Sequence, residues 1–169
     1  MKTSPKELKE TFGSLLLQNY ASEQGYTKLF TQFSSLALTA ELRATLSPER
    51  NELAQQLARL QQILKLMKLR PSKANTPIDE SFLMMGKEIC TGKKEGDLDR
   101  DVRILTAAKL ISYHRLAKIS SLEAMATAIG MEAVAMLLEQ SCAECRNSSA
   151  YLSQIEKNIL YPQVLQPQS

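Results

Sequence analysis

The sequence predicts an all-α protein built as a bundle of four long helices. Its 26 leucines and 17 alanines stand against three valines, a composition that favours helix over strand. Apolar residues recur at steps of three and four along four stretches, and no stretch alternates as a half-buried strand does. A chain of 169 residues can bury a core without disulfides. We therefore expect a single domain over residues 1–162 and a flexible tail over 163–169.

The first two long helices are expected over residues 5–37 and 39–69. Ser4 and Glu7 have the spacing of a capping box at the start of the first helix. Pro48 lies inside the second apolar pattern, where it removes a hydrogen bond and crowds the preceding turn. We expect the second helix either to kink there or to split at the residue before it.

A short helix is expected over residues 77–91, after a polar linker that contains Pro71. Phe82, Met85 and Ile89 lie three and four residues apart on it, so we expect them to pack against the bundle.

Two further long helices are expected over residues 97–129 and 131–160, with Gly130 as a suitable residue just beyond the end of the first. Tight connections make each pair of long helices an antiparallel hairpin, and the short helix lies in the long crossover between the hairpins. Two hairpins joined by one long crossover form the ferritin-like arrangement.

Polar residues interrupt all four apolar stripes near their middle. Their positions are Glu23 on the first helix, Glu49, Glu52 and Gln56 on the second, Ser112 and Arg115 on the fourth, and Cys145 and Ser148 on the last. Polar groups inside a core cost free energy unless they are paired. Four interruptions at one level therefore indicate one shared polar site, which in bundles of this kind is where carboxylates hold two metal ions.

Several stretches resemble the YciE/YciF family of ferritin-like bacterial stress proteins. The resemblance covers about residues 12–157 and is carried by the runs 15–23 and 107–117, by Glu52 and by the Arg59-Leu60 pair. It implies a ferritin-like fold, a stress-related role, and glutamate ligands at the level of the polar interruptions.

The chain departs from this family at half of the implied ligand positions. Ser112 and Arg115 replace a Glu-x-x-Glu pair, Cys145 replaces a glutamate next to Glu144, and Ser149 replaces an aspartate. The residual acids at ligand positions are Glu23, Glu49, Glu52 and Glu144. A site for hard divalent cations needs several oxygen ligands. We therefore expect a degenerate member of this family, with no cofactor and no catalytic activity. The alternative is a di-iron or di-manganese protein with an unusual ligand set.

Arg115 is expected to act as an internal cation. A buried guanidinium is costly without carboxylate partners, and it cannot escape by deprotonation. We expect it to bond at least one of Glu23 and Glu52, with Glu144 as a third candidate, at about 2.7–3.2 Å.

Two observations leave alternatives open. Glu49 either faces the shared site or is a solvated residue in the first turn after Pro48. Cys142 and Cys145 form a Cys-x-x-Cys, which we interpret as two small buried thiols, because it falls in the middle of a helix; a thiol redox pair is the alternative.

The remaining features concern partners and location. A net charge of +3, 5% aromatic residues and no tryptophan argue against nucleic-acid binding. No apolar segment has the length of a membrane span, and the amino terminus does not resemble a signal peptide. Three cysteines, an odd number, suggest a reducing compartment, so we expect a bacterial cytoplasmic protein. No feature identifies a small-molecule substrate.

Several leucines of the first helix lie off its inner line, so this helix is apolar on more than one face and we expect a homodimer. These leucines are Leu15, Leu17, Leu29, Leu36 and Leu38.

Overall fold

The computed structural model describes residues 4–92 and 97–164, and in those ranges every regular element is helical. In chain order the elements are α1 (Pro5–Leu36), α2 (Ala40–Leu46), α3 (Leu53–Leu66), α4 (Pro77–Thr91), α5 (Asp97–Ala128), α6 (Glu132–Ile155), a π-helical turn (Glu156–Leu160) and α7 (Tyr161–Val164). The all-α prediction is confirmed.

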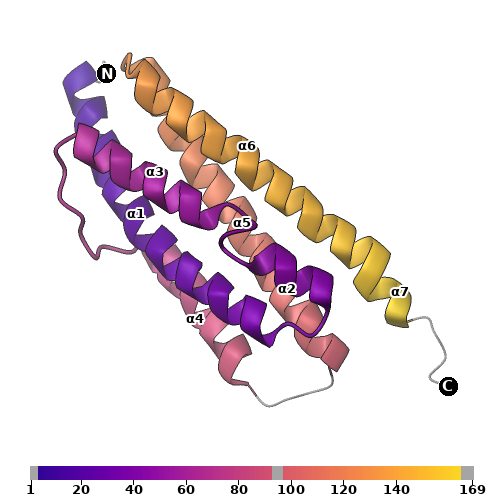
Figure 1. Ribbon diagram of the computed structural model, residues 1–169. Coiled ribbons are helices and arrows are strands. Elements are labelled where there is room, and N and C mark those ends of the chain that lie inside the picture. Colours follow the sequence, from indigo (N-terminus) through magenta and orange to yellow (C-terminus); the bar gives the residue numbers. More distant parts are fainter. Residues whose placement is uncertain (1–3, 93–96, 165–169) are drawn as a thin grey trace.

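The long helices form a four-part bundle of two hairpins (Figure 1). The first hairpin consists of α1 followed by α2 and α3, and the second consists of α5 followed by α6. Around the bundle α1 contacts α5, α5 contacts α6, and α6 contacts α2 and α3, which return to α1. Among the described residues the backbones of α1 and α6 do not approach each other as those of neighbouring helices do, so the two helices lie diagonally opposite. Helix α4 packs outside the bundle against α1 and α5.

The second helix is split, which is one of the two outcomes expected at Pro48. Helix α2 ends at Leu46 and α3 begins at Leu53. In the connection Glu52 takes a left-handed conformation with φ of 65°. The side chain of the buried Asn51 stabilises this turn, because its Oδ1 accepts a hydrogen bond of 3.1 Å from the Leu53 backbone N–H.

The bundle contains two apolar cores along its length. One surrounds Phe30 and Phe33 of α1 together with Leu105 of α5, and the other surrounds Phe12 of α1 and Leu138 of α6. The residues of α1 and α5 that lie between the two cores include buried polar and charged side chains. A polar layer therefore separates the cores at mid-height, as the interrupted stripes predict.

Helix α4 docks on α1 through reciprocal close contacts at two glycines. A Cβ added at Gly86 of α4 would lie 2.3 Å from Cδ2 of Leu29, and one added at Gly25 of α1 would lie 2.9 Å from Cδ1 of Leu83. Each leucine thus fills the space left by a glycine of the other helix. The predicted contacts of the short helix are also present, because its partly buried hydrophobic residues pack against the core; they include Phe82, Met85 and Ile89.

The carboxyl-terminal helix extends further than expected. After Ile155 the chain makes a π-helical turn and continues as α7 to Val164. The helix continues past Pro162 to Val164, so it includes the first two residues of the expected tail; the rest of that tail, 165–169, lies outside the described residues. Lys109 of α5 forms an ion pair with Glu156, which holds this turn against the bundle.

Candidate functional site

A buried ion pair between Arg115 of α5 and Glu23 of α1 forms the centre of the polar layer. Nε of Arg115 donates to one carboxylate oxygen of Glu23 and Nη2 donates to the other, both at 2.7 Å. Arg115 is 3% exposed and Glu23 is fully buried. Two parallel bonds between a planar guanidinium and a carboxylate are the strongest geometry for such a pair.

Two neutral side chains, Gln56 and Cys145, complete the layer, so α1, α3, α5 and α6 each contribute one residue to it. Nη2 of Arg115 also donates to Oε1 of Gln56 on α3 at 2.6 Å. The same oxygen lies 3.3 Å from Sγ of Cys145 on α6. The sequence marks Gln56 as one of the polar interruptions of the second helix, but not as a partner of Arg115.

The charges of this layer are matched within it. Burial, the largest single effect, would lower the pKa of Arg115, but the attraction and hydrogen bonds of Glu23 together with the effects of Cys145 and Tyr26 raise it. The guanidinium therefore stays charged inside the bundle.

The residues present do not fit a pair of metal ions. Glu23 is the one carboxylate bonded in the layer, and a fixed cation occupies its two oxygens. Over residues 4–92 and 97–164, no group of three or more His, Cys, Asp and Glu side chains is arranged to hold a metal ion. Hard divalent cations require more oxygen ligands than this layer offers.

Glu52 and Glu49 do not join the layer, which corrects the predicted cluster. Because α3 begins only after the left-handed turn, Glu52 lies in the turn itself and is half-buried, whereas Gln56 one turn later faces Arg115. Glu49 is exposed, and it accepts a hydrogen bond of 2.6 Å from the Ser47 hydroxyl. The solvated alternative is therefore correct for Glu49.

Glu144 is also absent from the Arg115 cluster, because a different arginine binds it. Both of its carboxylate oxygens accept from the guanidinium of Arg59 on α3, one of them at 2.6 Å. Arg59 further donates to Ser141 at 2.9 Å. This second pair is largely shielded from solvent and joins α3 to α6.

A second buried polar cluster, which the sequence did not predict, surrounds Asp79 in the first turn of α4. Asp79 is fully buried. Tyr26 donates to its Oδ1 at 2.7 Å, and His114 Nε2 lies 2.9 Å from the same oxygen. Its Oδ2 accepts from Lys118 at 2.7 Å and from Thr76 at 2.6 Å. Four groups from α1, α5 and the cap of α4 thus converge on one carboxylate.

The hydrogen bonds of this cluster fix the charge on Asp79. Burial by itself would raise the pKa of Asp79, but the donors, led by Lys118, outweigh burial and lower the pKa to about 2. The neighbouring Tyr26 has a raised pKa because it is buried and because it donates to Asp79. The cluster is therefore a carboxylate held by neutral and cationic donors, and it ties the crossover helix to the bundle.

The two cysteines of the Cys-x-x-Cys are not activated thiols. Both are buried on α6 and both are free. Burial raises the pKa of Cys142, and it raises the pKa of Cys145 to about 11 against a smaller opposing effect of Arg115. Reactive cysteines have a lowered pKa and partial exposure, so this pair matches the interpretation as small buried thiols.

Two solved structures share this fold over nearly their whole length. The E. coli stress protein YciF matches with a TM-score of 0.81 and 19% sequence identity, over 94% of this chain and 97% of that chain. YcfI, a putative structural protein from Rhodopseudomonas palustris, matches with a TM-score of 0.78 and 21% identity, over 86% and 92%. At these identities the likeness shows the fold alone, and it confirms the ferritin-like bundle.

The family comparison covers almost the whole chain. The curated proteins give no match. The model of a domain of unknown function, DUF892, matches residues 7–164. This match agrees with the resemblance to the YciE/YciF proteins and with the fold shared with YciF. The chain therefore belongs to the DUF892 family of YciE/YciF-type proteins.

Proposed function

We propose that this protein is a non-catalytic, metal-free bundle in which the Arg115–Glu23 pair takes the place of a di-metal centre. The observation that carries the proposal is the pairing of Glu23 with a buried guanidinium through two hydrogen bonds; among the described residues Glu23 is the only glutamate in the layer. A cation is already present at the centre of the bundle, and it neutralises the carboxylate that would otherwise be a ligand. The interior site is then structural, and it needs no cofactor.

The role of such a bundle is proposed from its family. The similar protein YciF is described as a stress protein and YcfI as a putative structural protein. We propose a stress-related, structural role in the bacterial cytoplasm for this chain. Three free cysteines fit a reducing compartment. In the described part of the chain, no helix has the length and hydropathy needed to cross a membrane.

Metal analysis combined with thermal unfolding tests the proposal. The protein is purified once without added metal and once after incubation with iron(II) or manganese(II), and it is then desalted. We expect less than one equivalent of metal per ten chains and the same melting temperature in all samples. Retention of one or two equivalents of either metal, together with a rise in melting temperature that is lost in Glu23→Ala, would contradict it.

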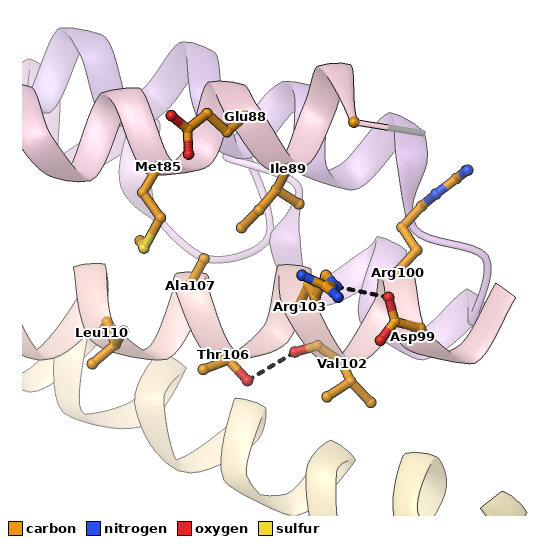
Figure 2. A pocket seen from close by; sticks show the side chains of 11 residues that line it. Met85, Glu88, Ile89, Asp99, Arg100, Val102, Arg103, Thr106, Ala107 and Leu110 are labelled. Atoms are coloured by element: carbon orange, nitrogen blue, oxygen red, sulfur yellow. Dashed lines mark hydrogen bonds and ion pairs between the residues drawn. The ribbon is translucent and has the colours of Figure 1, made fainter. Parts of the chain in front are cut away.

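We also propose that the protein is a homodimer that associates through α4 and α5. Helix α4 packs on Leu29, one of the leucines on the second apolar face of α1, so we assign the contact between copies to α4 and α5 instead. A groove of about 520 Å³ runs between α4 and α5. Figure 2 shows Met85 and Ile89 pointing from α4 toward α5, with Ala107 opposite them. Leu110 at the edge of this groove is 49% exposed.

The charges at this groove favour a second copy of the same chain. Its lining includes Glu88 and Asp99 as well as Arg100 and Arg103. An isologous contact places one patch against itself, so a patch that carries both signs can pair with its own copy. Light scattering across a range of concentrations tests this proposal. We expect a dimer mass for the wild type and for Met136→Glu, which is 70% exposed on α6, and a monomer mass for Leu110→Glu. A monomeric wild type, or a dimeric Leu110→Glu, would overturn it.

A further inference from the structure

A second groove, of about 480 Å³, opens between α1, the start of α4 and α5, beside the Asp79 cluster. Leu15 of α1 and Leu122 and Met125 of α5 give it an apolar side. Asn19 of α1 and Lys118 of α5 are among its polar lining residues. A concave, mostly apolar site of a few hundred Å³ with a few converging polar groups is typical of small-molecule binding.

The Asn19 side chain in this groove lacks hydrogen-bond partners. Asn19 is 1% exposed, and neither its Oδ1 nor its Nδ2 is bonded to any described group. A buried polar group without a partner is destabilising. Leucine has the same branched arrangement of side-chain heavy atoms and would avoid that cost on this apolar face. The amide therefore keeps hydrogen-bonding capacity that no described group of the chain uses.

Lys118 and His114 line the same groove as Asn19. Nζ of Lys118 donates to Ser22 at 2.8 Å and to Asp79 at 2.7 Å, which uses two of its three protons. His114, on the same face of α5, also lines the groove, and its Nε2 faces Asp79. Both oxygens of Asp79 already accept two bonds each. The polar end of the groove therefore offers donors, while its single carboxylate is fully occupied.

We propose that this groove binds a small amphipathic carboxylic acid, whose carboxylate accepts from the Asn19 amide and the Lys118 ammonium while its hydrocarbon part lies against Leu15, Leu122 and Met125. A carboxylate matches a set of donors that includes one cation. The apolar lining disfavours multiply charged anions, because their remaining charges would be desolvated without partners. The site is separate from the Arg115 layer, so it does not depend on the absence of a di-metal centre.

Titration calorimetry with octanoate, octanamide and octan-1-ol tests the proposal on the full-length protein. We expect octanoate to bind more tightly than octanol. Asn19→Leu should weaken octanoate binding about tenfold, because a hydrogen bond to a charged group is lost. The matched control Gln55→Leu, an exposed amide on α3 outside the groove, should bind like the wild type.

A second variant keeps the test decisive if Asn19→Leu does not fold. Met125→Trp fills the groove and leaves Asn19 and Lys118 unchanged, and it should also abolish octanoate binding. Three results would overturn the proposal: no binding of octanoate to the wild type, equal binding of octanoate and octanol, or unchanged binding in Asn19→Leu or in Met125→Trp. If octanamide is the tightest ligand, the recognised group is a neutral amide and the carboxylic acid is wrong.

Discussion

Glu52 occupies a backbone conformation that is unfavourable for its residue type. Its φ of 65° lies in the left-handed region, where a side chain with a Cβ costs roughly 1 kcal/mol and asparagine is better tolerated. Since its carboxylate is outside the Arg115 layer, Glu52→Asn should keep or raise the free energy of unfolding in urea, by up to about 1 kcal/mol. Glu23→Gln is the comparison, and its free energy of unfolding should fall by several times that amount, because Arg115 would lose its charged partner. A clear loss in Glu52→Asn would place its carboxylate in an interior pair.

The two glutamates also show how far the sequence predicts the interior site. The Arg115–Glu23 pair was predictable because each residue interrupts an apolar stripe and a buried guanidinium requires an acid. The sequence could not exclude Glu52 as a partner of Arg115, because an unbroken helix through Pro48 would have turned its side chain toward the core. The left-handed turn shifts the facing position to Gln56, and no periodicity encodes such a turn.

The crossover helix α4 depends on glycine for its close approach to α1. A methyl group at Gly86 would meet the side chain of Leu29, which is 4% exposed and has little room to move. Gly86→Ala should therefore lower the free energy of unfolding by about 1–3 kcal/mol. Gly13→Ala in α1 is the matched control: its nearest neighbour, Leu69, lies at an ordinary 3.4 Å, so it should gain about 0.5–1 kcal/mol from helix propensity. Equal effects of the two changes in urea unfolding would contradict this account of the contact.

The Asp79 cluster makes the docking of α4 dependent on pH. The pKa of Asp79 is about 2 in the folded protein, below the ordinary value of 3.8. Its contribution to stability is therefore complete above the unfolded value and is lost as the pH falls through 2. The difference in unfolding free energy between the wild type and Asp79→Asn should shrink by about 2 kcal/mol between about pH 5 and pH 2. A difference that stays constant over this range would show that Asp79 is not held as a carboxylate.

The elements themselves were largely predictable, whereas the attachment of α4 was only partly so. The spacing of apolar residues and the capping residues located the helices. The spacing of Phe82, Met85 and Ile89 indicated the buried face of α4. Asp79 was visible in the sequence only as an acid in the first turn of a helix, where the helix dipole alone would explain it. Apart from Thr76 at the cap of α4, its partners come from two distant segments, α1 and α5, so their convergence follows from the tertiary structure.

At the scale of the whole molecule, two apolar cores are joined across one polar layer. Because Arg115 on α5 donates hydrogen bonds to Glu23 on α1 and to Gln56 on α3, the layer couples both hairpins of the bundle. Loss of one charge leaves the other buried and unpaired, which is far more costly than replacing both by apolar groups. The layer should therefore behave as one unit in global unfolding.

A double-mutant cycle on Arg115 and Glu23, measured by urea unfolding at neutral pH, tests the central claim most directly. Arg115→Met alone and Glu23→Leu alone should each lower the free energy of unfolding by about 3–5 kcal/mol. The double variant should recover most of that loss, because no unpaired charge remains. Single variants as stable as the wild type, or a double variant whose loss equals the sum of the two single losses, would contradict the claim that Arg115 is the internal cation of this bundle.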